Sequence, residues 1–261
     1  MGTHVTDNRA IARAIKLPIA FVTLLGLSTT ASAHVKWFTH TDGHDRPVEP
    51  FALLTPTFAV VFCVALLLVF VGFLIDGWIA KRWPQLLKMG RTTEAFEQRV
   101  VRAAAGAYFV FVSSVGGIIL TPELRSTASW LPIVQFLAAL SLVWRRSCIV
   151  AGVAIFILYD YGVAKYGVFH LVDYVFMLTL ALYFSSLSLP WPRLAALRER
   201  MLSGGLAFSL AWTAIEKFLY PQWTEAVVAI HPVIAMGMPM ATVVVIAGFV
   251  EFTLAFYLIT G

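Results

Sequence analysis

The feature that most constrains this chain is an apolar run near its end that is long enough to cross a lipid bilayer. The segment 240–260 carries a single charged side chain, Glu251. A hydrocarbon core about 30 Å thick needs about 20 residues of helix. Similar runs recur along the chain, which is 60% hydrophobic and only 13% charged. This composition is typical of a polytopic helical membrane protein and excludes an ordinary soluble domain.

The sequence predicts an all-α transmembrane helical bundle of about seven spans. The transmembrane domain is expected over 56–261, with spans near 56–78, 103–120, 130–144, 149–161, 168–187, 201–220 and 240–260. Lys and Arg gather between alternate spans, around 81–102, at Arg145 and Arg146, and around 193–200. Positive charge marks the cytoplasmic side, so the net charge of +5 reflects topology in a bacterial inner membrane and not nucleic-acid binding.

The N-terminus resembles a targeting segment followed by an exported arm. Arg9, Arg13 and Lys16 precede a short apolar run that ends in an A-x-A site at Ala31 and Ala33. This pattern predicts a cleavable signal peptide over 1–33 and a periplasmic arm over 34–55. The alternative is an uncleaved anchor, although the apolar run is short for a span.

The two helices at the C-terminal end carry an ordered set of basic, small and acidic residues: Arg200, Gly204, Gly205, Lys217, Gly248 and Glu251. This order resembles the DoxX family of small membrane proteins. A weaker second match opens at Arg102 and Gly106. The resemblance implies a membrane subunit that works with a periplasmic or membrane redox partner, because the family includes a quinone-linked subunit of thiosulfate oxidation.

Ionisable residues are expected to gather at the outer ends of several spans. Ionisable groups are costly at membrane depth, so we expect them to face other helices, a wet cavity or one another. The candidate catalytic residues are Asp160, His170, Asp173, Glu216, Lys217 and Glu251. A quinone head needs a hydrogen-bonding group with aromatic residues around it, and Tyr159 and Tyr161 are the candidates for that contact.

A second interpretation is copper binding. Cleavage after Ala33 would give a mature N-terminal His34, which offers an amine and an imidazole from one residue. Imidazole suits Cu(II) and thioethers select Cu(I). The candidate metal ligands are His34, His40, His44, His231, Met236, Met238 and Met240.

A third interpretation is a transporter or an assembly factor. Intramembrane Asp, Glu, His and Lys are also the residues that a proton or solute pathway uses. The connection from His231 to Pro239 contains the one helix break that resembles those of transporters.

Overall fold

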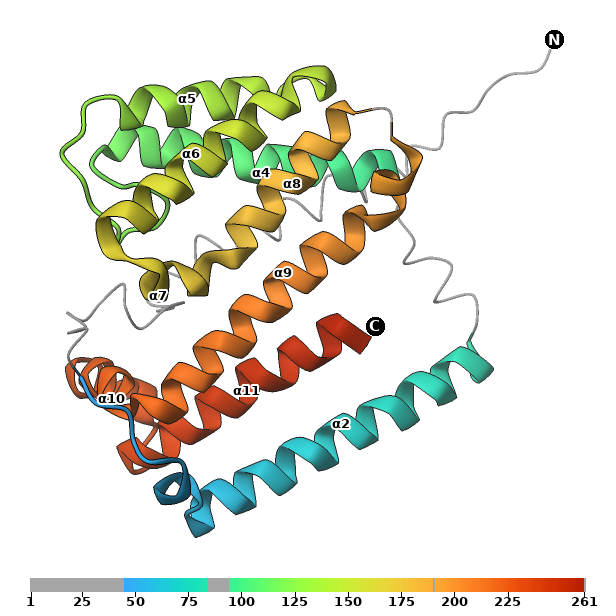
Figure 1. Ribbon diagram of the computed structural model, residues 1–261. Helices are drawn as coiled ribbons and strands as arrows, with labels where there is room; N and C mark the ends of the chain where they lie inside the picture. Colours follow the sequence, from blue (N-terminus) through green and yellow to red (C-terminus); the bar gives the residue numbers. More distant parts are fainter. Residues whose placement is uncertain (1–44, 84–93, 190, 261) are drawn as a thin grey trace. The chain divides into compact units, whose positions relative to one another are not determined.

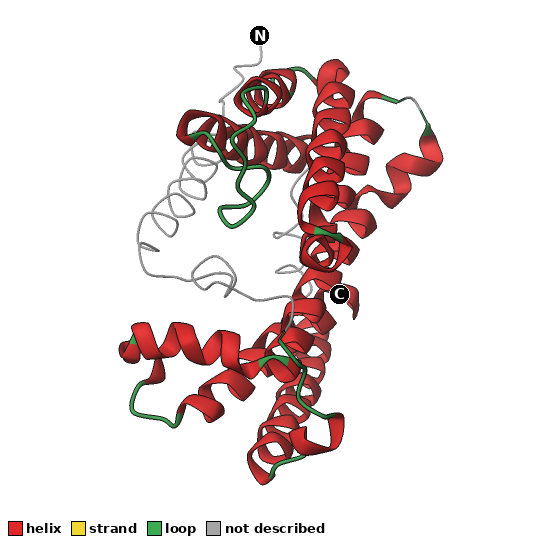
Figure 2. Ribbon diagram, turned by 60° about the vertical axis from the view of Figure 1, so that its left-hand side comes forward, coloured by secondary structure: helices red, strands yellow, loops and turns green. Residues whose placement is uncertain are grey.

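The computed structural model describes residues 45–83, 94–189 and 191–260. Within these ranges the chain is helical and forms no strand, so the all-α prediction is confirmed (Figure 2). The predicted signal peptide 1–33 and the arm residues His34, His40 and His44 lie outside the described residues.

The elements follow one another along the chain as Figure 1 shows. They are η2 (Pro50–Leu53), α2 (Pro56–Arg82), α4 (Glu94–Val115), α5 (Leu131–Ser141), η3 (Arg145–Ser147), α6 (Cys148–Tyr166), α7 (Val168–Leu171), η4 (Val172–Tyr174), α8 (Val175–Ser188), α9 (Pro192–Leu219), α10 (Pro221–Ile230), η5 (Pro232–Ala235) and α11 (Met240–Thr260).

Local chemistry explains where several of these helices begin and end. The Thr55 hydroxyl accepts a hydrogen bond from the Phe58 N–H at 3.1 Å, and Pro56 supplies the first helical residue of α2. Helix α4 ends at Val115 because Gly116 and Gly117 both adopt φ +69°. The helix therefore ends before the bound predicted at 120, and the residues up to that bound form a buried loop.

Four helices in the described part of the chain are long and apolar enough to cross a membrane: Pro56–Arg82, Arg145–Tyr166, Val168–Ser188 and Met240–Thr260. Helix α2 has no buried residue, and its Leu66, Leu67 and Phe70 are 52%, 59% and 59% exposed. So much exposed apolar surface indicates contact with lipid. The described helices thus support a multi-pass membrane protein.

Two elements differ in length from their sequence-based bounds. Helix α5 has 11 residues, which at 1.5 Å per residue is about half the thickness of a hydrocarbon core. Helix α9 has 28 residues and begins at Pro192, before the bound predicted at 201. Its basic first turns form a polar extension, since Arg193, Arg198 and Arg200 precede the apolar part.

The helices pack on their neighbours in a continuous series. Helix α4 contacts α5, α5 contacts α6, α6 contacts α8, α8 contacts α9, α9 contacts α11, and α11 contacts α2 (Figure 1). The main core cluster lies among α4, α5, α6, α8 and the loop between α4 and α5. Fully buried Phe109, Ile119, Leu131, Ile155 and Phe184 belong to this cluster.

Small residues allow these helices to approach closely. A Cβ built at Gly205 of α9 would lie 1.9 Å from Thr179 Oγ1 of α8, and one at Gly248 of α11 would lie 2.5 Å from Cε1 of Phe218. Close approach at small residues is the usual means of packing helices in a membrane, where dispersion forces must replace the hydrophobic effect. The packing of α9 against α8 and α11 fixes the register of the polar residues described next.

Candidate functional site

An ion pair joins α9 to α11 within the packed part of the molecule. Lys217 Nζ lies 2.9 Å from Glu251 Oε1 and 2.8 Å from Oε2. The two side chains are 9% and 20% exposed, and the Thr213 hydroxyl also donates to Glu251 Oε2 at 3.0 Å. The expectation that these ionisable groups face other helices is confirmed for this pair. Because the carboxylate has three donor contacts, its charge is well compensated.

Glu216 lies one residue before Lys217 on α9 and is only 5% exposed. One turn earlier on the same helix, the Trp212 indole N–H donates to Glu216 Oε1 at 3.0 Å. Residues four apart lie on the same helix face, so this bond is a local product of the sequence. It holds the carboxylate in a fixed orientation beside the indole ring.

Aromatic rings pack one against the next at the C-terminal end of α9. The Phe169 ring centroid lies 6.1 Å from that of Trp212 and 6.2 Å from that of Tyr220. Tyr220 in turn stacks on Trp223 at 4.3 Å, with the rings 6° from parallel. Since α7 supplies Phe169 and α10 supplies Trp223, three elements contribute to one aromatic wall next to Glu216.

The turn formed by α7 and η4 brings His170 and Asp173 to the same end of α9. The contacts of Phe169 with α9 and those between η4 and α9 place the turn there. Asp173 is 3% exposed, whereas His170 is half-buried. The backbone of the turn is held from α6, because the Tyr159 hydroxyl donates to the Leu171 carbonyl at 2.7 Å. Tyr159 thus supports the turn that carries both predicted residues.

The other residues predicted on α6 have different surroundings. Asp160 is exposed. The Tyr161 hydroxyl lies 2.8 Å from the hydroxyl of Ser126, in the loop between α4 and α5. Of the predicted residues on α6, only Asp160 faces outward, whereas Tyr159 and Tyr161 bond to the turn after α6 and to the loop before α5.

The candidate copper ligands that the structure describes do not share one environment. His231 follows the last residue of α10 and is exposed, as are Met236 and Met240. Met238 packs against the small apolar cluster of Val228, Ala235 and Val243. Among the described residues, no group of three or more His, Cys, Asp or Glu side chains is placed so that it could hold a metal ion.

The described part of the arm, which begins at Asp45, is hydrogen-bonded beside the aromatic wall. The Trp223 indole N–H donates to Asp45 Oδ2 at 2.6 Å, and the Val48 N–H donates to the Leu219 carbonyl at 2.8 Å. Leu219 is the last residue of α9, so its carbonyl has no partner within that helix. The arm supplies one, which orders the chain over this end of the bundle.

Sequence reasoning missed the rings of the aromatic wall and two polar contributors to the site. The missed residues are Trp212, Phe169, Tyr220, Trp223, Thr213 and Asp45. Thr213 and Trp212 each precede a predicted residue by four positions on the same helix, which is the spacing of side chains that touch. A search for polar or indole partners at that spacing from Glu216 and Lys217 would have found them. Asp45 carries no comparable signal, because its contact with Trp223 spans 178 residues.

The fold and the site define a class of protein. Over the described residues the chain is all-helical, has membrane-spanning candidates, and buries a lysine and carboxylates where its helices meet. Comparison of the chain with protein-family models, with curated proteins and with solved structures finds no match. The residues at the end of α9 therefore carry the functional interpretation.

Proposed function

We propose that the chain is an integral membrane subunit of a periplasmic redox system and that it receives a quinone head at the end of α9. The observation that carries the proposal is buried Glu216 fixed by Trp212 beside the aromatic rings of Phe169 and Tyr220. An aromatic wall with an oriented carboxyl group is the environment that a flat, apolar, hydrogen-bonding head requires. The resemblance of Lys217 and Glu251 to the DoxX pattern points in the same direction.

Each residue of the site has a separate task in this proposal. A bound quinone would supply two-electron, two-proton redox chemistry. Glu216 holds or releases a proton at its carboxyl group, and Trp212 keeps that group oriented. The rings of Phe169 and Tyr220 bind the apolar head and exclude water. The ion pair between Lys217 and Glu251 keeps α9 and α11 in register beside the site.

The electrons would be exchanged with a partner protein. The sequence contains no C-x-x-C-H haem attachment motif, and its two cysteines, Cys63 and Cys148, are free thiols far apart in sequence. A redox subunit built from such a chain needs a partner or a bound metal to complete its electron path. The arm over 34–55, exported after cleavage following Ala33, is the proposed contact on the periplasmic side.

The proposal includes seven spans with the mature N-terminus outside, and cysteine labelling tests that orientation. In a background without Cys63 and Cys148, cysteines replace Arg146 and Gln222, which are both exposed. In intact cells a membrane-impermeant thiol reagent should label the cysteine at 222 and leave that at 146 unmodified until the cells are opened. Labelling at 146 in intact cells would reverse the orientation and move the Glu216 end to the cytoplasm.

Bound quinone in the purified protein tests the function. Protein extracted in a mild detergent should retain quinone at a higher ratio to phospholipid than the membrane it came from. Trp212→Ala should bring that ratio down to the membrane value, because the variant removes the indole ring and its hydrogen bond to Glu216. Trp191→Ala is the matched control, since Trp191 is 57% exposed and lies at the other end of α9.

Two results would contradict the proposal. One is a wild-type quinone ratio no higher than that of the membrane. The other is equal loss in both tryptophan variants, which would mean that quinone partitions on the protein surface and not at Glu216.

A further inference from the structure

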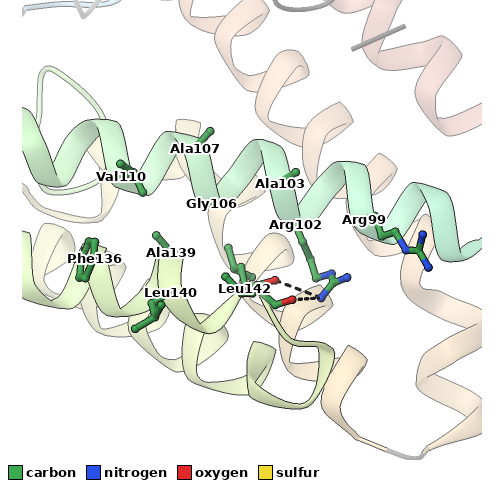
Figure 3. Close-up of a pocket in the computed structure, with 11 residues that line it drawn as sticks. Arg99, Arg102, Ala103, Gly106, Ala107, Val110, Phe136, Ala139, Leu140 and Leu142 are labelled. Atoms are coloured by element: carbon green, nitrogen blue, oxygen red, sulfur yellow. Dashed lines mark hydrogen bonds between the residues drawn. The ribbon is translucent and has the colours of Figure 1, made fainter. Parts of the chain in front are cut away.

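A groove between α4 and α5 has the features of a second binding site, far along the chain from the residues of the proposed function. Its volume is about 450 Å³. Ala103, Gly106 and Ala107 of α4 line it with Phe136, Ala139 and Leu140 of α5. Figure 3 shows the two helices side by side, with Arg99 and Arg102 toward one end of the groove.

Arg102 is held in place by backbone carbonyls and still has donors to offer. Its Nε donates to the Gln98 carbonyl at 3.3 Å. Its Nη1 donates to the carbonyls of Leu142 and Val143, each at 3.2 Å, which are the dashed lines in Figure 3. These bonds use Nε and Nη1, and the Cys148 thiol also lies within hydrogen-bonding reach of the same guanidinium, so part of its five N–H donors remains. In the ranges that the structure describes, Arg99 has no ion pair. A fixed guanidinium beside a second cation is suited to a phosphate group.

The body of the groove is apolar and open to its surroundings. Val110, Phe136 and Leu140 are 48%, 52% and 46% exposed. In a multi-pass membrane protein such side chains face acyl chains. Trp144 is 62% exposed and lies next to Arg145 and Arg146, and tryptophan beside basic residues marks the level of the lipid head groups.

Gly106 leaves the groove unfilled. A Cβ at this position would meet only the Ala139 carbonyl oxygen, at 3.9 Å, which is ordinary contact. Packing of α4 on α5 therefore does not require glycine here, unlike at Gly205 and Gly248. The bare surface lies one turn beyond Arg102, where an acyl chain would continue from a phosphate.

We propose that this groove binds one anionic phospholipid, with its phosphate at Arg99 and Arg102 and an acyl chain over Gly106. Basic pockets between transmembrane helices on the cytoplasmic side are known sites for anionic head groups. Charge selects the head group, and the apolar groove selects a ligand that carries a chain. A soluble anion satisfies only the first requirement, and a zwitterionic lipid satisfies only the second in full.

Native mass spectrometry of the detergent-solubilised full chain measures this preference directly. The probes are phosphatidylglycerol, phosphatidylethanolamine with the same acyl chains, and inorganic phosphate. We expect the wild type to retain phosphatidylglycerol over phosphatidylethanolamine. Arg99→Gln should weaken phosphatidylglycerol binding by about fivefold, the effect of one basic residue near an anionic head group.

Matched variants separate the site from general surface charge. Arg146→Gln removes an equal charge from an exposed position outside the groove lining and should leave binding unchanged. Gly106→Leu fills the groove and should reduce phosphatidylglycerol binding to the level of phosphatidylethanolamine. Gly204→Leu adds the same side chain at a helical glycine with nothing within 4 Å and should bind as the wild type does.

Three outcomes would overturn the inference. Equal retention of both lipids by the wild type would remove the head-group selectivity. Equal effects of Arg99→Gln and Arg146→Gln would assign binding to diffuse charge. Displacement of phosphatidylglycerol by inorganic phosphate, with Gly106→Leu unaffected, would reduce the site to one for a soluble anion.

Discussion

Lys217→Met should destabilise the folded protein by about 3 kcal/mol, because it leaves the partly buried Glu251 without its cation. Of the donors that the described residues provide, the Thr213 hydroxyl would be the one left to that carboxylate. Unfolding in mixed micelles of a mild detergent and sodium dodecyl sulfate measures the change. Arg146→Met also removes one positive charge, but from an exposed position, and should change stability by less than about 0.5 kcal/mol.

The double variant Lys217→Met, Glu251→Leu tests whether the loss comes from the unpaired charge. Apolar residues that replace both members of a buried ion pair are often tolerated or stabilising, so most of the lost stability should return. Recovery would give a large coupling free energy between the two positions. If the double variant is instead as unstable as the sum of the two single variants, the pair contributes nothing beyond its separate side chains.

Gly152→Ala should destabilise the contact between α6 and α8 by about 2 kcal/mol. The added Cβ would lie 2.6 Å from the Ala181 carbonyl oxygen and 2.2 Å from Ser185 Oγ. A hydroxyl can rotate away, but the carbonyl belongs to the backbone of α8, so the helices must separate. The change can be followed by the same mixed-micelle unfolding measurement.

Gly204→Ala is the control for the helical preference of alanine over glycine. Its Cβ would have nothing within 4 Å, so the variant should be neutral or more stable by up to about 1 kcal/mol. Adding Ser185→Ala to Gly152→Ala removes the hydroxyl contact alone and should recover only part of the loss. Full recovery would show that the carbonyl of Ala181 does not limit the approach of the helices.

Long apolar runs made the strongest elements predictable. Helices α2 and α11 lie close to the spans expected at 56–78 and 240–260, because apolar length alone determines that assignment. The start of α4 was missed because Glu94, Gln98 and Arg99 make its first turns polar. Those turns are stabilised by interactions with other groups: Glu94 accepts from Gln98 and from Arg198 of α9.

The pairing of Lys217 with Glu251 depends on the register between two helices, which no local sequence pattern specifies. Glu251 was singled out because it stands alone in an apolar run, and Lys217 because it lies near a helix end. Their contact depends on how far α11 slides along α9, which the close approach of Gly248 to Phe218 helps to set. The contact between Lys217 and Glu251, which are 34 residues apart, could therefore be identified only from the packed structure. The aromatic wall needed it too, since three elements supply its rings.

The contact between α2 and α11 has a consequence for how the protein is made. The Tyr257 hydroxyl donates to the Leu68 carbonyl at 3.1 Å, across 189 residues. At about 5–20 residues per second, α2 waits on the order of 10–40 s after its own synthesis before its neighbour exists. During that time the helices between α2 and α11 are still being made, and α2 lies in lipid without its contacts to α11. Helix α2 has an apolar surface and no buried residue even in the finished fold, so it can remain in lipid without a partner helix.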